Sequence, residues 1–262
     1  MTAVPNLARR ARIGAAFAAA QDYDHNARVQ HKVALGLAQT IAGLALPAGT
    51  AALELGCGTG FLTAELVRRR LASRLVVTDL APVMVERCRA RVGEVPGLTF
   101  RALDGEHGER PGEAPFGLIA ASLTFQWFDD LPAALARLGS WLVPGGVLAF
   151  TTLAAGTFAE WRAAHEGLGL ASGTPAFPTG GELAGMAPAG TEIAVSLGRL
   201  VEPQGSARAF LHGVKAIGAG TASPGHQPLP PGALRQVMAA FEAAGAVATY
   251  QVATCVLRKA AA

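Results

Sequence analysis

The chain has 262 residues, of which 51% are hydrophobic and 16% are charged, and its formal net charge at pH 7 is +3. This length fits one α/β domain with an added segment, and so small a positive charge argues against nucleic acid as a partner. No stretch approaches the ~20 consecutive apolar residues that a membrane-spanning helix needs, so we expect a soluble, cytoplasmic protein with no membrane partner.

The first element in chain order is helical. Residues 7–45 carry helix-like apolar spacing and contain a polar cluster at 23–26. Arg9 and Arg10 precede an alanine-rich run, which is one feature of a twin-arginine export signal. The run is short and lacks a clear cleavage site, so the pattern favours an amphipathic helix.

The segment 53–60, LELGCGTG, predicts a buried strand, a tight turn and the start of a helix. Gly56, Gly58 and Gly60 allow the backbone to approach a ligand, and the helix start at Phe61 offers N–H donors to anionic groups. A dinucleotide-binding fingerprint needs glycine where Phe61 stands, and no Lys-Ser or Lys-Thr follows to complete a P-loop. A dehydrogenase is therefore disfavoured.

Strands and helices alternate along the rest of the chain. Further strands are predicted over residues 74–78, 98–101, 116–121, 146–152, 192–200 and 247–257. Helices are predicted over residues 61–71, 82–92, 131–142, 207–218 and 231–243. The Gly-, Pro-, Ser- and Thr-rich segment 168–190 predicts a loop. This order predicts an α/β fold with a doubly wound, mostly parallel, seven-stranded sheet that binds ligands beyond the carboxyl ends of its strands.

Two acidic residues follow predicted strands. Asp79 ends the second strand, where a carboxylate can accept both hydroxyls of a ribose, although it also suits an N-cap of the next helix. Asp104, after the third strand, suits either an adenine amino group or a turn. Met84 suits either an adenine face or the core.

Metal and disulfide chemistry are not predicted. Cys57, Cys88 and Cys255 are scattered along the chain, and the six histidines show no spacing typical of metal ligands.

Two resemblances follow from these residues. Glu54, placed two residues before Gly56 and its alternating glycines, resembles motif I of the class I S-adenosylmethionine (SAM) methyltransferases. Over nearly its whole length the chain resembles the malonyl-acyl-carrier-protein O-methyltransferases of biotin synthesis. The segments that carry this resemblance are AAFAAAQDYDHNARVQ (15–30), LELGCGTGFLT (53–63), VTDLAPVMVERCR (77–89), ASLTFQWFDDLPAALARL (121–138), LVPGGVLAFTTLAAGTFAEW (142–161) and FLHGVKAIGAG (210–220). One departure is that Asn26 stands where the family usually has histidine, and His25 precedes it.

The resemblance implies a function. It implies SAM as cofactor, S-adenosylhomocysteine as product, and methyl transfer to the free carboxylate of a malonyl thioester carried by acyl carrier protein or coenzyme A. Other SAM methyltransferases, acting on another small acid, a quinone or an amine, and a non-catalytic SAM-binding protein are the alternatives. The residues implied for cofactor binding are Tyr23, Gln30, Glu54, Gly56, Cys57, Gly58, Gly60, Asp79, Leu80, Met84, Asp104, Gly105 and Ser122. The candidates for contact with the accepting carboxylate are Lys215, His212, Arg208 and Tyr23.

The expected organisation follows the same resemblance. Residues 1–45 form a helical cap over the SAM site, and residues 46–262 form the methyltransferase domain. A substrate-side cap is expected around residues 157–245 within that domain.

Overall fold

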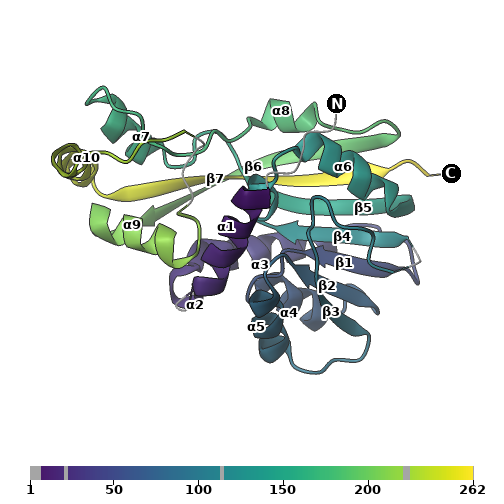
Figure 1. Ribbon diagram of the computed structural model, residues 1–262. Coiled ribbons are helices and arrows are strands. Elements are labelled where there is room, and N and C mark those ends of the chain that lie inside the picture. The colour runs from purple at the N-terminus through teal and green to yellow at the C-terminus, as the bar shows by residue number, and fades with distance from the viewer. Residues whose placement is uncertain (1–6, 21–22, 113–114, 221–224, 262) are drawn as a thin grey trace.

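The computed structural model of the chain describes residues 7–20, 23–112, 115–220 and 225–261 (Figure 1). Its sheet has seven strands in the order β3-β2-β1-β4-β5-β7-β6. The strands are β1 (Ala51–Leu55), β2 (Leu75–Asp79), β3 (Leu98–Ala102), β4 (Phe116–Ser122), β5 (Leu142–Leu153), β6 (Thr191–Pro203) and β7 (Val247–Lys259). The α-helices are α1 (Leu7–Ala19), α2 (Tyr23–Asn26), α3 (Arg28–Ala42), α4 (Phe61–Arg68), α5 (Pro82–Val92), α6 (Leu131–Ser140), α7 (Ala159–Glu166), α8 (Gly180–Ala184), α9 (Ala207–Ala216) and α10 (Pro231–Ala243), and η1 (Phe125–Trp127) is a 3₁₀ turn.

The predicted doubly wound sheet is confirmed. Strands β3, β2, β1, β4 and β5 pair in parallel, whereas β7 pairs antiparallel with both β5 and β6. The chain moves outward from β1 to β3 and then crosses to β4 on the other side of β1. This reversal leaves a crevice at the carboxyl ends of β1 and β4, which is where such sheets bind ligands.

Alternate side chains of the central strands enter two separate cores. Leu53 and Ile119 pack with Leu135 of α6 on one face, and α8 also covers this face. Ala52 packs on the other face with Leu37 of α3, beside α4. This alternation is the period-two pattern of a strand that is buried on both sides.

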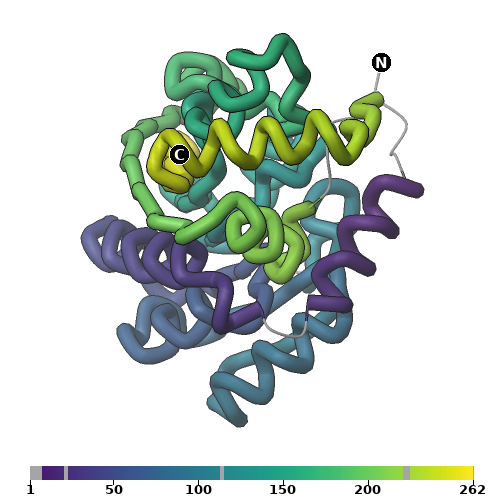
Figure 2. Tube along the Cα trace, turned by 90° about the vertical axis from the view of Figure 1, so that its left-hand side faces the viewer, coloured from purple at the N-terminus to yellow at the C-terminus, as the bar shows by residue number. Residues whose placement is uncertain are grey.

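A third core holds the helices at one end of the molecule together. Trp161 of α7, Phe210 of α9 and Phe241 of α10 form an aromatic cluster, with ring centroids 5.3–5.4 Å apart. Figure 2 shows α9 and α10 side by side in front of the sheet, with α1 next to them. These helices form the wall that faces α1.

The observed elements depart from the predicted ones in three places. The segment 168–190 is not a continuous loop, because a capping box between Thr179 and Glu182 starts α8 inside it. Helix α7 has no counterpart among the predicted helices. The predicted helical region 7–45 is divided into α1, α2 and α3. In the described parts of the chain, the helices are too short or too polar to cross a membrane.

Candidate functional site

The loop between β1 and α4 forms the floor of a pocket. Gly58 and Gly60 adopt positive φ angles of 53° and 94°, which glycine tolerates without steric cost. A methyl group on Gly60 would lie 2.9 Å from Cys88 Sγ, so this glycine also permits the close packing of α4 on α5. A methyl group on Gly58 would meet nothing nearer than the Tyr23 hydroxyl, 3.8 Å away. Gly58 therefore leaves room for a ligand against its backbone.

Two backbone groups orient the carboxylate of Asp79 at the end of β2. Its Oδ2 accepts a hydrogen bond from the Gly58 N–H at 2.9 Å, and its Oδ1 accepts one from the Ala81 N–H at 2.8 Å. Burial raises the pKa of Asp79, and these N–H groups oppose the rise. Each oxygen keeps one lone pair for a ligand, which suits two adjacent hydroxyls. Ala81, not Asp79, occupies the N-cap of α5.

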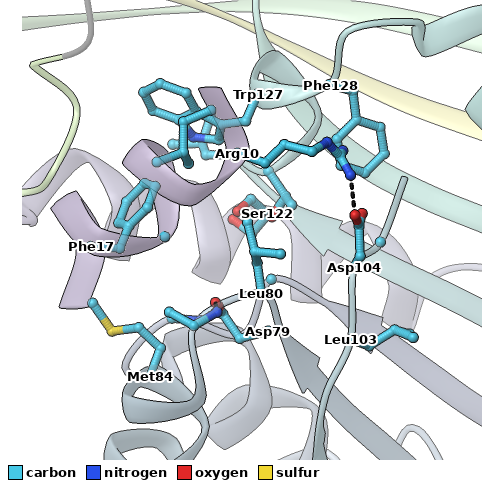
Figure 3. A pocket seen from close by; sticks show the side chains of 18 of the residues that line it. Arg10, Phe17, Asp79, Leu80, Met84, Leu103, Asp104, Ser122, Trp127 and Phe128 are labelled. Atoms are coloured by element: carbon cyan, nitrogen blue, oxygen red, sulfur yellow. Dashed lines mark hydrogen bonds and ion pairs between the residues drawn. The ribbon is translucent and has the colours of Figure 1, made fainter. Parts of the chain in front are cut away.

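The pocket lies at the carboxyl ends of β1, β2 and β4, and α1 covers it (Figure 3). Ile13 and Phe17 of α1 face the interior, and the ring of Phe17 meets Trp127 edge-on with centroids 5.5 Å apart. Nine of the predicted cofactor residues line this pocket: Tyr23, Gly56, Gly58, Asp79, Leu80, Met84, Asp104, Gly105 and Ser122. The sequence prediction therefore converges on one crevice, at the expected edge of the sheet.

A buried cluster of ion pairs fastens α1 over this pocket. Arg10 is 7% exposed and pairs with both Asp104 and Glu106. The Glu106 Oε1 also accepts hydrogen bonds from the backbone N–H groups of Asp129 and Asp130, at 2.8 and 2.7 Å. The cluster thus joins the first helix to the segments that follow β3 and η1.

Comparison with known proteins identifies the family. Residues 53–148 match the family model described as a methyltransferase domain. The chain is 36% identical over 247 residues to a malonyl-[acyl-carrier protein] O-methyltransferase of Magnetococcus marinus, and this region covers 93% of the chain and 91% of that protein. The chain belongs to the malonyl-[acyl-carrier protein] O-methyltransferase family.

A second relative and a solved structure are also similar to the chain. The biotin biosynthesis bifunctional protein BioCD of Bordetella avium is 44% identical over 237 residues. That region covers 90% of this chain and 50% of BioCD, so the chain spans about half the length of that relative. The YcgJ protein of Bacillus subtilis superposes with a TM-score of 0.61 at 13% identity, over 87% of this chain and 99% of that one. The structural likeness supports the fold alone.

Four residues implied by the resemblance to malonyl-[acyl-carrier protein] O-methyltransferases lie outside the pocket lining: Gln30, Glu54, Cys57 and Gly60. Glu54 is 1% exposed beneath the glycine loop, and burial raises its pKa well above the usual range of a carboxyl. Cys57 is buried within the loop, and Gln30 is half-buried on α3. Glu54 and Cys57 therefore support the loop from behind, and the cofactor contacts of all four residues stay predictions.

Tyr23 is held against the glycine loop by its neighbour on α2. Asp24 accepts a hydrogen bond from the Thr59 hydroxyl at 2.6 Å and forms an ion pair with Arg91. Burial raises the pKa of the Tyr23 phenol, and the nearby carboxylate of Asp79 adds to the rise. The Tyr23 hydroxyl is therefore a hydrogen-bond donor at neutral pH.

The three cationic candidates on α9 do not reach the cofactor pocket. Arg208, His212 and Lys215 are exposed, and they do not belong to the lining of the pocket described above. His212 and Lys215 instead line a second cavity of about 940 Å³, which α1 also borders. Tyr23 is therefore the one candidate for contact with the accepting carboxylate that lines the cofactor pocket. Across the described ranges, the His, Cys, Asp and Glu side chains form no cluster that could hold a metal ion.

Proposed function

We propose that the chain transfers the methyl group of SAM to the free carboxylate of a malonyl thioester, in the biotin pathway for which its relative BioCD is named. The observation that carries this proposal is the match to nearly the full length of a malonyl-[acyl-carrier protein] O-methyltransferase, in a chain whose predicted SAM residues converge on one pocket. Acyl carrier protein or coenzyme A would bear the malonyl group. Both occur with SAM in the cytoplasm, which is the location we propose.

The pocket offers contacts for the ribose and the adenine of SAM. Asp79 accepts the two ribose hydroxyls, with its carboxylate already oriented by Gly58 and Ala81. Met84 lies in the lining beside it and suits the adenine face. Asp104 Oδ1 accepts the backbone N–H groups of Glu106 and His107, and Oδ2 pairs with Arg10, which leaves one lone pair for the adenine amino group.

The reaction is an in-line displacement at the methyl carbon of the sulfonium. A carboxylate oxygen attacks that carbon, the C–O bond forms, and the electron pair of the breaking C–S bond stays on sulfur as S-adenosylhomocysteine. An ordinary carboxyl with a pKa of about 4 is already ionised at neutral pH, so no general base is needed. The protein contributes alignment and exclusion of water, and orientation of reactants supplies up to ~7–11 kcal/mol.

Tyr23 is the proposed contact of the accepting carboxylate. Its hydroxyl lies beside Gly58 at the floor of the pocket, and its raised pKa keeps it a neutral donor. A neutral donor orients an anion with less loss of nucleophilicity than a cation would cause. Tyr23→Phe is expected to lower kcat about tenfold and to leave the dissociation constant of SAM within about twofold, because one hydrogen bond to a charged group is lost. Equal losses in kcat and SAM affinity would place Tyr23 on the cofactor instead.

The proposed domain division follows from these positions. We propose residues 1–45 as the N-terminal unit, in which α1 covers the SAM pocket and α3 packs on the sheet, and residues 46–262 as the methyltransferase domain. The aromatic cluster of α7, α9 and α10 supports a substrate-side cap at about residues 157–245.

The direct test is mass spectrometry of malonyl-carrier protein and malonyl-coenzyme A after incubation with SAM and the protein. The expected result is a thioester heavier by one methylene, together with S-adenosylhomocysteine, and the relative rates rank the two carriers. SAM binding without any methylated thioester would contradict the malonyl substrate and direct the search to other small acids or quinones.

A further inference from the structure

A second cavity lies beside the SAM pocket and shares no lining residue with it. It occupies about 940 Å³ between α1, α7 and α9, with segments near residues 172–175 and 226–229 closing its sides. Phe158, Trp161 and Phe210 give it an apolar floor. A cavity of this size is in the range of ligand sites, which combine apolar walls with a few polar groups.

Helix α1 is a wall shared by the two cavities. Ile13, Gly14 and Phe17 line the SAM pocket, whereas Ala16, Ala19 and Ala20 line the second cavity. Within each set one residue lies three and four positions from the other two, which places each set on its own face of the helix. The backbone of Phe17 also lies close to the second cavity, since a methyl group on Gly218, which lines that cavity, would lie 3.1 Å from the Phe17 backbone nitrogen. The two cavities therefore lie next to each other, with α1 bordering both.

Basic side chains of α9 border the second cavity. Arg208, His212 and Lys215 occur at positions i, i+4 and i+7 of α9 and therefore share one face of that helix. All three are exposed, and His212 and Lys215 line the cavity itself. Within the described ranges, no carboxylate lies within ion-pair distance of these three side chains. This face is therefore available to an anionic group at the mouth of the cavity.

We propose, on the basis of the thioester substrate proposed above, that this cavity binds the phosphopantetheine arm that carries the malonyl group, and that His212 and Lys215 bind its phosphate. The arm is a flexible chain of amides and methylenes with a thioester at one end and a phosphate at the other. The malonyl carboxylate has to reach the SAM methyl group, so the phosphate lies at the opposite end, away from the SAM pocket. This order assigns the basic side chains of α9 to the phosphate and not to the accepting carboxylate. Arg208, one turn farther along the same face, extends the cationic surface toward whatever carries the arm.

The test uses two substrates that differ in the phosphate alone, malonyl-phosphopantetheine and malonyl-pantetheine. Wild-type protein is expected to prefer the phosphorylated substrate by about tenfold in kcat/KM, since one exposed ion pair with Lys215 and one hydrogen bond from His212 together contribute about that much. The double variant His212→Ala/Lys215→Ala is expected to lose this preference through a higher KM for the phosphorylated substrate. Its kcat/KM for malonyl-pantetheine and its SAM affinity should stay within about twofold of wild type. Arg235→Ala, which removes an exposed cation from the neighbouring helix α10, is the matched control and should retain the preference.

The outcomes separate this inference from the proposed function. If the double variant loses equal kcat/KM for both substrates, His212 and Lys215 contact the accepting carboxylate instead. If it keeps the wild-type preference for the phosphorylated substrate, they do not contact the phosphate. Either result overturns the phosphate assignment. If the wild-type protein methylates no malonyl thioester, the proposed function is overturned, and so is the assignment of the phosphopantetheine arm to this cavity. Malonyl-coenzyme A and malonyl-carrier protein, assayed in parallel, distinguish the two sources of the arm.

A second variant tests the cavity without removing charge. Ala16→Phe places a ring in the second cavity, and Ala15→Phe places the same ring on the exposed side of α1, where it lines neither cavity. Ala16→Phe is expected to lower kcat/KM for every malonyl thioester at least about tenfold, since a displaced substrate loses its alignment. SAM affinity measured by calorimetry should stay within about twofold in both variants. Full thioester turnover by Ala16→Phe would exclude the cavity as the site of the arm.

Discussion

Asp79→Ala is expected to weaken SAM binding at least about a hundredfold, because two hydrogen bonds from ribose hydroxyls to a charged acceptor are lost together. The fold is expected to survive. Burial raises the pKa of Asp79, which means that the folded state disfavours its ionised form. Removing this buried charge offsets the loss of the hydrogen bonds from Gly58 and Ala81.

Calorimetric titration with SAM and a thermal melt of the same sample check this prediction. Glu86→Gln is the matched control, since it removes an exposed carboxylate from α5 close to Asp79 in the chain without altering the pocket lining. It should bind SAM like wild type. Unchanged affinity in Asp79→Ala would remove this residue from the ribose role, and a collapsed melting transition would show that it supports the fold instead.

The same residue predicts a direction for the pH dependence of SAM binding. A carboxylate accepts hydrogen bonds with both oxygens, whereas the protonated acid presents a donor on one of them. SAM affinity should therefore be highest above the raised pKa of Asp79 and should fall as the pH decreases through that pKa. Asp79→Ala should flatten this part of the profile.

The features that sequence patterns located correctly depend on local chain geometry. A strand followed by Gly56, Gly58 and Gly60 defines its own turn, and Asp79 ends the neighbouring strand, so the topology of the sheet brings them together. The helical character of residues 7–45 was predicted in the same way, from its apolar spacing. Its break at α2 was not, although Asp24 anchors that turn to Thr59 on the glycine loop.

Contacts between distant segments lay beyond the same patterns. Arg10 pairs with Asp104, which is 94 residues away in the chain, and no residue spacing in the sequence predicts such a pair. Lys215 was linked to the accepting carboxylate on its sequence context, but its place depends on how α9 packs through Phe210 against α7 and α10. Helix α7 is eight residues long and is stabilised by the packing of Trp161, so it lacks the extended periodicity that identifies longer helices.

Arg10→Ala is expected to release α1 from the SAM pocket. The variant leaves the Glu106 side chain, which is 1% exposed, without its cationic partner, and loss of one member of a buried ion pair costs about 3–5 kcal/mol. Arg9 keeps its more exposed ion pair with Asp129 and its hydrogen bond to the Trp127 carbonyl, and the bond from Arg87 to the Ala20 carbonyl lies at the far end of the helix. We therefore expect amide hydrogen exchange in residues 7–19 to accelerate about a hundredfold, with less change in the central strands.

The SAM affinity of Arg10→Ala is a second measure of whether α1 is released. Ile13 and Phe17 leave the pocket lining when α1 detaches, so SAM affinity should fall about tenfold through the loss of apolar contact. Arg12→Ala is the matched control, since Arg12 is exposed on the same helix and lines neither cavity. Its exchange and SAM affinity should match wild type. If Arg10→Ala behaves like this control, the ion-pair cluster does not hold α1 in place. The contacts of Arg9 with Asp129 and the Trp127 carbonyl, together with the aromatic contact between Phe17 and Trp127, would then keep the helix over the cofactor.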